Sequence, residues 1–111
     1  MSRRMLSGAL ALTLAAVLGG AEPAAAFTTR ARIVDNAFKP KRLEIPQGSR
    51  VLWLNKGSDT HTVTARNGDF DSGDLAPGEK FSYKFLDTGV FRYYCKNHPD
   101  EMKGRVLPGD V

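Results

Sequence analysis

Turn-forming residues interrupt this 111-residue chain at short, regular intervals from residue 27 onward. The segments between the turns are rich in β-branched and aromatic residues, and none of them has the apolar spacing of a convincing amphipathic helix. Turns that recur roughly every 8–12 residues are typical of a sandwich or a barrel. The sequence therefore predicts one all-β domain, with strands at 28–34, 42–45, 50–55, 61–65, 80–85, 90–95 and 103–107.

Side-chain patterns indicate how some of these segments are buried. Residues 80–85 (KFSYKF) alternate between aromatic and polar side chains, so one face of this strand should enter the core. Residues 50–55 (RVLWLN) contain a continuous apolar run, which predicts a strand covered on both faces. Pro77 and Gly78 suit the two central positions of a type II turn. The polar, glycine-rich segment 66–75 is predicted to be a surface loop.

Residues 1–26 have the three parts of a secretory signal peptide. Arg3 and Arg4 form a basic head, residues 8–18 form a short apolar run, and three alanines end the segment. The apolar run is well short of the roughly 20 residues that a membrane-spanning helix needs. We therefore expect export to the periplasm and cleavage after Ala26. A retained N-terminal anchor is the alternative, and the choice between the Sec and twin-arginine export routes stays open.

The remaining residues, 27–111, provide about 85 positions, enough for one small domain with one modest core. Removal of Arg3, Arg4 and Glu22 with the signal peptide lowers the formal net charge from +4 to +3. The charges are mixed along the chain, and no aromatic-basic motif accompanies them. This pattern does not favour nucleic-acid binding. We expect a monomer that has no stable membrane insertion once the signal peptide is removed.

Cys95 is the only cysteine in the chain. A buried structural thiol is one interpretation, because free cysteine often packs as a small apolar residue. In an oxidising compartment, however, a single cysteine is usually paired between chains or chemically occupied. His98 follows three residues later across a predicted tight turn, and Met102 lies at the far side of the same loop. The segment FRYYCKNHPDEMKG thus brings a thiol, an imidazole and a thioether into one short stretch.

These donor types limit the choice of metal. Structural zinc sites close with four cysteine or histidine ligands, and a thioether is not among the usual ligands of zinc. Two histidines and one cysteine with a weak axial methionine are typical of an electron-transfer copper centre. His61, the only other histidine of the chain, is the candidate for the second imidazole. The alternatives are a surface histidine at position 61, a plain loop histidine at 98 and a core methionine at 102.

The chain resembles a cupredoxin, a type 1 (blue) copper protein of the plastocyanin, amicyanin and pseudoazurin group. The resemblance covers nearly all of residues 27–111. It rests on a lone histidine before a strand, the segment NGDFDSGDLAPGEKFSYKF and the terminal YYCKNHPDEMKG. It implies a Greek-key β-sandwich of about seven to eight strands, with one copper ion near one end. It also implies that His61, Cys95 and His98 are equatorial ligands and that Met102 is the axial ligand.

The sequence departs from the family pattern at two places. Thr62 follows the first histidine, where relatives often have an asparagine that ties the two ligand loops together. The backbone N–H of Thr62 can still donate to the Cys95 sulfur, and its hydroxyl can help to join the loops. Three residues separate His98 from Met102, where relatives commonly have two or four. The distance of Met102 from the metal therefore stays open.

The resemblance implies a small exported carrier that moves single electrons by cycling between Cu(I) and Cu(II). Its partners would be periplasmic redox proteins, such as a cytochrome c, a reductase or a dehydrogenase. A periplasmic copper-delivery protein without redox cycling is the alternative, although such proteins usually have exposed methionine and histidine clusters. An enzyme is not expected, because no acid, base or nucleophile constellation accompanies the site. Partners should dock near His98, where Pro99 and Phe38 would form a small apolar patch.

Overall fold

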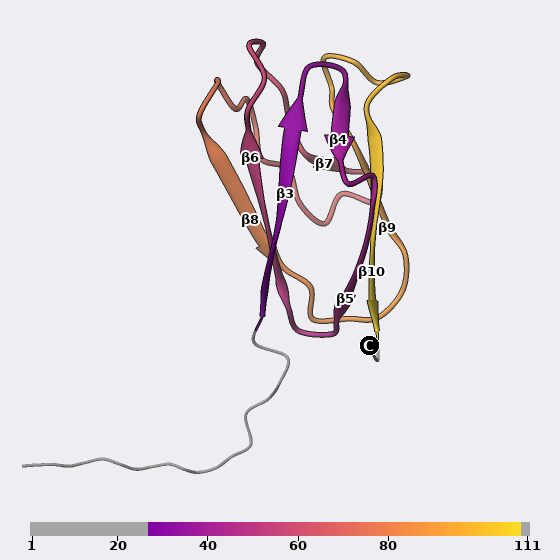
Figure 1. The fold of residues 1–111 in the computed structure, drawn as a ribbon. Helices are drawn as coiled ribbons and strands as arrows, with labels where there is room; N and C mark the ends of the chain where they lie inside the picture. The colour runs from indigo at the N-terminus through magenta and orange to yellow at the C-terminus, as the bar shows by residue number, and fades with distance from the viewer. Residues whose placement is uncertain (1–26, 110–111) are drawn as a thin grey trace, which may run out of the picture.

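The computed structural model describes residues 27–109, which form two four-stranded sheets packed face to face (Figure 1). Within this range the chain has no helix, and therefore none that could span a membrane. The predicted signal peptide, residues 1–26, lies outside the described residues. The strands are β3 (Thr28–Val34), β4 (Ala37–Lys39), β5 (Arg42–Pro46), β6 (Arg50–Asn55), β7 (Thr64–Ala65), β8 (Lys80–Lys84), β9 (Phe91–Tyr94) and β10 (Lys103–Gly109).

The two sheets have the strand orders β4-β3-β6-β8 and β5-β10-β9-β7. The pairs β3–β6 and β5–β10 are parallel, and the other pairs are antiparallel. From β4 to β9 the chain changes sheet at every connection. The loop after β6 and the loop between β9 and β10 both lie at the upper end of the sandwich in Figure 1. This arrangement confirms the predicted all-β sandwich.

The core is centred on Trp53 of β6, whose side chain is fully buried. Its ring packs against Tyr93 of the opposite sheet at a centroid distance of 5.2 Å and against Phe81 of its own sheet at 6.0 Å. Large aromatic rings provide much of the apolar area that a domain of this size can bury. The same buried cluster includes Cys95 and Met102. Two residues of the predicted site therefore belong to the core.

The segment 66–75, predicted as a surface loop, is partly buried. His61 and Leu75 exchange both backbone hydrogen bonds, with N···O distances of 3.1 and 2.8 Å. This pairing folds the segment back against the chain that precedes β7, and it buries Leu75 together with Phe70. Of the predicted strand 61–65, only the two residues of β7 pair with β9. Because polar and glycine residues dominate this segment, its composition did not predict that these two apolar side chains would be buried.

One further strand prediction differs from the structure and one strand was not predicted, whereas the turn prediction is confirmed. In β6 only alternate side chains are buried, and Leu52 and Leu54 are partly exposed, so the strand is not covered on both faces. The short strand β4, which was not predicted, pairs with the end of β3. At the predicted turn Gly78 has φ 89°, and the Glu79 N–H donates to the Ala76 carbonyl at 2.9 Å. A positive φ at this position is what a type II turn requires.

Candidate metal centre

Three nitrogen and sulfur donors converge at the end of the sandwich where the loop after β6 meets the loop after β9. The Cys95 Sγ lies 3.7 Å from Nδ1 of His61 and 3.8 Å from Nδ1 of His98. The three donor atoms all lie within 4.8 Å of one another. His61 and Cys95 are fully buried, and His98 is partly exposed. The structure thus brings together three of the four residues that the sequence singled out, from positions up to 37 residues apart in the chain.

The separations between these donors fit one metal ion. Donors bonded to a first-row metal at about 2.0–2.3 Å and about 120° apart lie roughly 3.8 Å from each other. The two sulfur–nitrogen distances, 3.7 and 3.8 Å, match this trigonal arrangement. His61, Cys95 and His98 therefore form a candidate copper site, and Met102, whose backbone carbonyl accepts the Cys95 N–H, is the candidate fourth ligand.

The loop between Cys95 and Met102 is a compact turn held by its own backbone. The His98 N–H donates to the Cys95 carbonyl at 3.1 Å, and the Met102 N–H donates to the His98 carbonyl at 3.0 Å. The Cys95 N–H in turn donates to the Met102 carbonyl at 3.1 Å. The three-residue spacing before Met102 is accommodated by this turn, which returns the chain to Cys95 and leaves the Met102 side chain fully buried.

Thr62 joins the two loops that carry the donors. Its backbone N–H donates to the Cys95 Sγ at 3.3 Å. Its hydroxyl accepts the Lys96 N–H at 2.9 Å and shares a hydrogen bond with the Thr64 hydroxyl at 3.0 Å. These contacts confirm the expectation that a threonine here can take part in tying the loops together. Asn97 adds a further link, because its side-chain amide donates to the Thr60 carbonyl at 2.9 Å.

Asp35, which the sequence analysis missed, contacts the side of His61 that faces away from the thiol. Its Oδ1 lies 2.9 Å from Nε2 of His61. An ionised carboxylate can only accept a hydrogen bond, so Nε2 is the donor in this contact, and the tautomer with its single proton on Nε2 leaves the Nδ1 lone pair available. This tautomer directs a free electron pair toward Cys95. A carboxylate behind a ligating histidine is a common way to orient a metal site.

The carboxylate of Asp35 is itself held in place by the loop after β6. It accepts the Ser58 hydroxyl at 2.7 Å and the backbone N–H groups of Ser58 and Asp59 at 3.1 Å. These hydrogen bonds, the Ser58 hydroxyl first and the His61 ring next, hold the pKa of Asp35 well below its usual range. Gly57 leaves room for this contact, because a Cβ at that position would collide with Oδ1 of Asp35. Asp35 directly follows β3, whose parallel pairing with β6 gives no local sequence signal.

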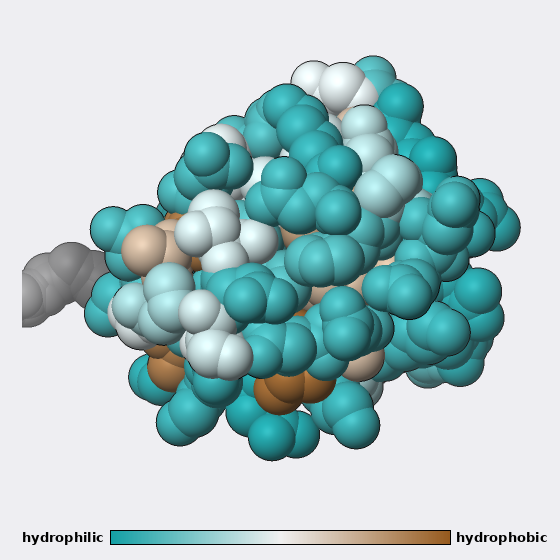
Figure 2. Space-filling model, turned by 90° about the horizontal axis from the view of Figure 1, so that it is seen from above, coloured by the Kyte–Doolittle hydropathy of each residue, from teal (hydrophilic) through white to brown (hydrophobic). Residues whose placement is uncertain are grey.

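The expected apolar patch around His98 is only partly present. Pro99 is exposed beside it. Phe38, however, is 3% exposed and packs edge-on against Tyr93 at a centroid distance of 4.8 Å, so it belongs to the core. The prediction that Phe38 would contribute to a contact surface is wrong, because β4 directs this ring inward. The upper end of the sandwich is mostly hydrophilic, with small apolar areas (Figure 2).

Comparison with known proteins agrees with this fold and site. The sequence profile of the cupredoxin-like domain matches residues 7–107, and the chain belongs to this family. Plastocyanin from Scenedesmus fuscus is 30% identical over 81 residues, which cover 62% of this chain and 83% of that protein. Plastocyanin from Sambucus nigra is 29% identical over 84 residues, which cover 63% of this chain and 85% of that protein.

Solved structures give the same result. A purple cupredoxin from Nitrosopumilus maritimus superimposes with a TM-score of 0.67 at 30% identity, covering 73% of this chain and 99% of that one. An oxidised amicyanin variant, 21% identical with a TM-score of 0.67, shares the fold, and the match covers 72% of this chain and 80% of that one. A copper-containing nitrite reductase from Thermus scotoductus, at 26% identity and a TM-score of 0.69, covers 88% of this chain but only 25% of that enzyme.

Proposed function

We propose that His61, Cys95, His98 and Met102 hold one copper ion and that the protein carries single electrons between exported redox proteins. The convergence of the Cys95 thiol with the Nδ1 atoms of two histidines is the observation that carries this proposal. Copper bound there would supply one-electron chemistry by cycling between Cu(I) and Cu(II). Membership of the cupredoxin-like family supports a general role in electron transfer.

Burial favours electron transfer over copper delivery. His61, Cys95 and Met102 are each fully buried, and His61 is fixed from behind by Asp35. A delivery protein must release its metal to an acceptor, and release requires that acceptor ligands reach the ion. A carrier needs the opposite, because rigid ligands in a dry site keep the rearrangement between the two oxidation states small. The site therefore suits a resident ion better than a transported one.

We propose that electrons enter and leave through His98, because it is the partly exposed member of the site and the others are buried. Redox partners would dock at this end of the sandwich in small, short-lived complexes. Introducing a charge at the adjacent Pro99 with Pro99→Glu should slow electron exchange with a partner while the copper spectrum stays unchanged. An unaltered exchange rate would place the entry point elsewhere. Export of the protein to the periplasm is part of the proposal and rests on the composition of residues 1–26.

The test of the function is a redox cycle followed by a metal-retention measurement. The oxidised copper-loaded domain is mixed with ferrocytochrome c in a stopped-flow instrument, and the oxidation of the cytochrome is recorded. A carrier accepts one electron per copper and keeps its metal through repeated cycles in the presence of a Cu(I) chelator. Rapid loss of copper to the chelator, without electron exchange, would support delivery and contradict the proposal.

A further inference from the structure

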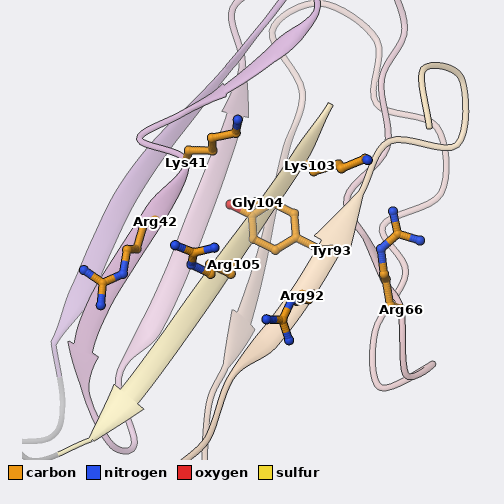
Figure 3. Close-up of a pocket in the computed structure, with 8 residues that line it drawn as sticks. All are labelled: Lys41, Arg42, Arg66, Arg92, Tyr93, Lys103, Gly104 and Arg105. Carbon is orange, nitrogen blue, oxygen red and sulfur yellow. The ribbon is translucent and has the colours of Figure 1, made fainter. Parts of the chain in front are cut away.

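Six cationic side chains surround a cavity of about 390 Å³ on the sheet formed by β5, β10 and β9 (Figure 3). All six are exposed to solvent. Tyr93 and Gly104 complete the lining, and no acidic residue contributes to it. We name this surface the basic face, and it consists of Lys41, Arg42, Arg66, Arg92, Lys103 and Arg105.

Three of these cations lie in one row across neighbouring strands. Arg105 of β10 is in register with Arg42 of β5 on one side and with Arg92 of β9 on the other. Neighbouring strands are about 4.8 Å apart, and like charges directly opposite each other destabilise a sheet. The row therefore works against the stability of the isolated domain. An external negative charge would relieve this repulsion.

The domain itself neutralises little of this charge. Arg42 pairs with Glu44 at 2.5 Å, but both side chains are about half exposed, and such surface pairs contribute little. The Arg66 guanidinium lies over the Tyr94 ring, 4.6 Å from its centroid. Within residues 27–109, none of the other four cations of the basic face forms a salt bridge.

The chemistry and the position of the basic face both bear on its partner. Four of its six cations are arginines, whose planar guanidinium binds carboxylates through two parallel hydrogen bonds. The basic face also adjoins the candidate copper site, because Cys95 directly follows β9 and Lys103 directly follows Met102. A protein bound on it would lie alongside the end of the sandwich that carries His98.

We propose that the basic face docks a carboxylate-rich surface of the redox partner. The identity of this partner as an electron donor or acceptor rests on the proposed function, whereas the attraction itself depends only on the charges of the face. Complementary charges speed the encounter of two proteins and orient them before close contact. The face would thus bring an acidic protein to the electron-transfer end of this basic domain.

The proposal is tested with poly-L-glutamate as the acidic probe, using calorimetry at low ionic strength. The variant of the basic face combines Arg42→Gln, Arg92→Gln and Arg105→Gln. The matched control combines Arg30→Gln, Arg32→Gln and Lys84→Gln, which removes the same charge from exposed positions on the opposite sheet. We expect the first variant to bind the probe about tenfold more weakly or worse, and the control to change by less than about threefold. Equal losses in the two variants would show a general charge effect and overturn the proposal.

Two further measurements separate the alternatives. Inorganic phosphate should displace the probe no better than chloride at equal ionic strength, and stronger displacement by phosphate would overturn the docking surface in favour of a small oxyanion site. Cys95→Ser, which removes the thiol from the candidate copper site, should bind the probe as the native chain does. If the native copper-loaded chain binds the probe but fails the redox cycle, the proposed function is refuted and the docking surface stands. Loss of binding specific to Cys95→Ser would contradict the docking surface.

Discussion

The link between the two ligand loops can be cut with one substitution, Thr62→Val. Thr62 is 2% exposed, and its hydroxyl accepts the Lys96 N–H at 2.9 Å. Valine has nearly the same shape as threonine, so the substitution fills the same space and removes the hydroxyl. The backbone N–H that Thr62 donates to the Cys95 sulfur is unaffected.

The expected cost follows from the groups that lose their partners. Thr64 keeps its second hydrogen bond, in which its hydroxyl donates to Asp71 at 3.2 Å. The Lys96 N–H, by contrast, loses its acceptor. A partly buried donor left without an acceptor costs about 1–3 kcal/mol. For a domain of this size each kcal/mol lowers Tm by roughly 4–8 °C.

Thermal unfolding of the copper-free protein, followed by circular dichroism, measures this effect. Thr62→Ser is the matched control, because it keeps the hydroxyl and loses one methyl group. We expect Thr62→Val to be less stable than Thr62→Ser, and the visible band of the copper-loaded variants to keep its position. The reasoning is refuted if Thr62→Val is as stable as the native protein, or if Thr62→Ser is the less stable of the two.

Three further predictions concern the surroundings of the site. Hydrogen bonds lower the pKa of Asp35 in the folded protein. The ionised Asp35 side chain therefore stabilises the fold above about pH 4, and this stabilisation is lost as the pH falls further. Urea unfolding of copper-free Asp35→Asn should therefore depend less on pH between 5 and 2 than that of the native chain, and an identical pH dependence would contradict this. Met102→Gln should lower the reduction potential, because an oxygen donor favours Cu(II), and Met102→Leu should raise it, because loss of the thioether disfavours Cu(II). Protein-film voltammetry measures both potentials, and equal values would identify Met102 as a core-packing residue. Gly104→Ala should destabilise the domain by about 1–3 kcal/mol in urea unfolding, because its Cβ would lie 2.5 Å from the Tyr93 hydroxyl, and native stability would refute this.

The parts of the fold and site that could be predicted from sequence are those with a local pattern. The segment from Cys95 to Met102 carries three candidate donors in one loop, and their spacing alone indicated a shared site. His61 could be added because no other histidine was available. The alternation in 80–85 and the glycine turn at Gly78 likewise depend only on neighbouring residues.

The features that sequence could not predict depend on pairing between distant segments. Asp35 reaches His61 because β3 and β6 are parallel neighbours, and this pairing has no signature at either position. Leu75 and Phe70 are buried because their segment returns to pair with His61, although polar and glycine residues dominate its composition. Phe38 sits in a short strand whose direction is set by its pairing with β3, and a loop was expected there.

The central claim is that Cys95 and two histidines bind one copper ion as a set, and optical spectroscopy of the copper-loaded domain tests it most directly. The native domain should bind one copper ion and show an intense visible band, which arises from charge transfer between the Cys95 thiolate and Cu(II). Cys95→Ser should lose this band, because an oxygen ligand gives no charge transfer at such low energy. Persistence of the band in Cys95→Ser, or binding of two copper ions per chain, would contradict the assignment.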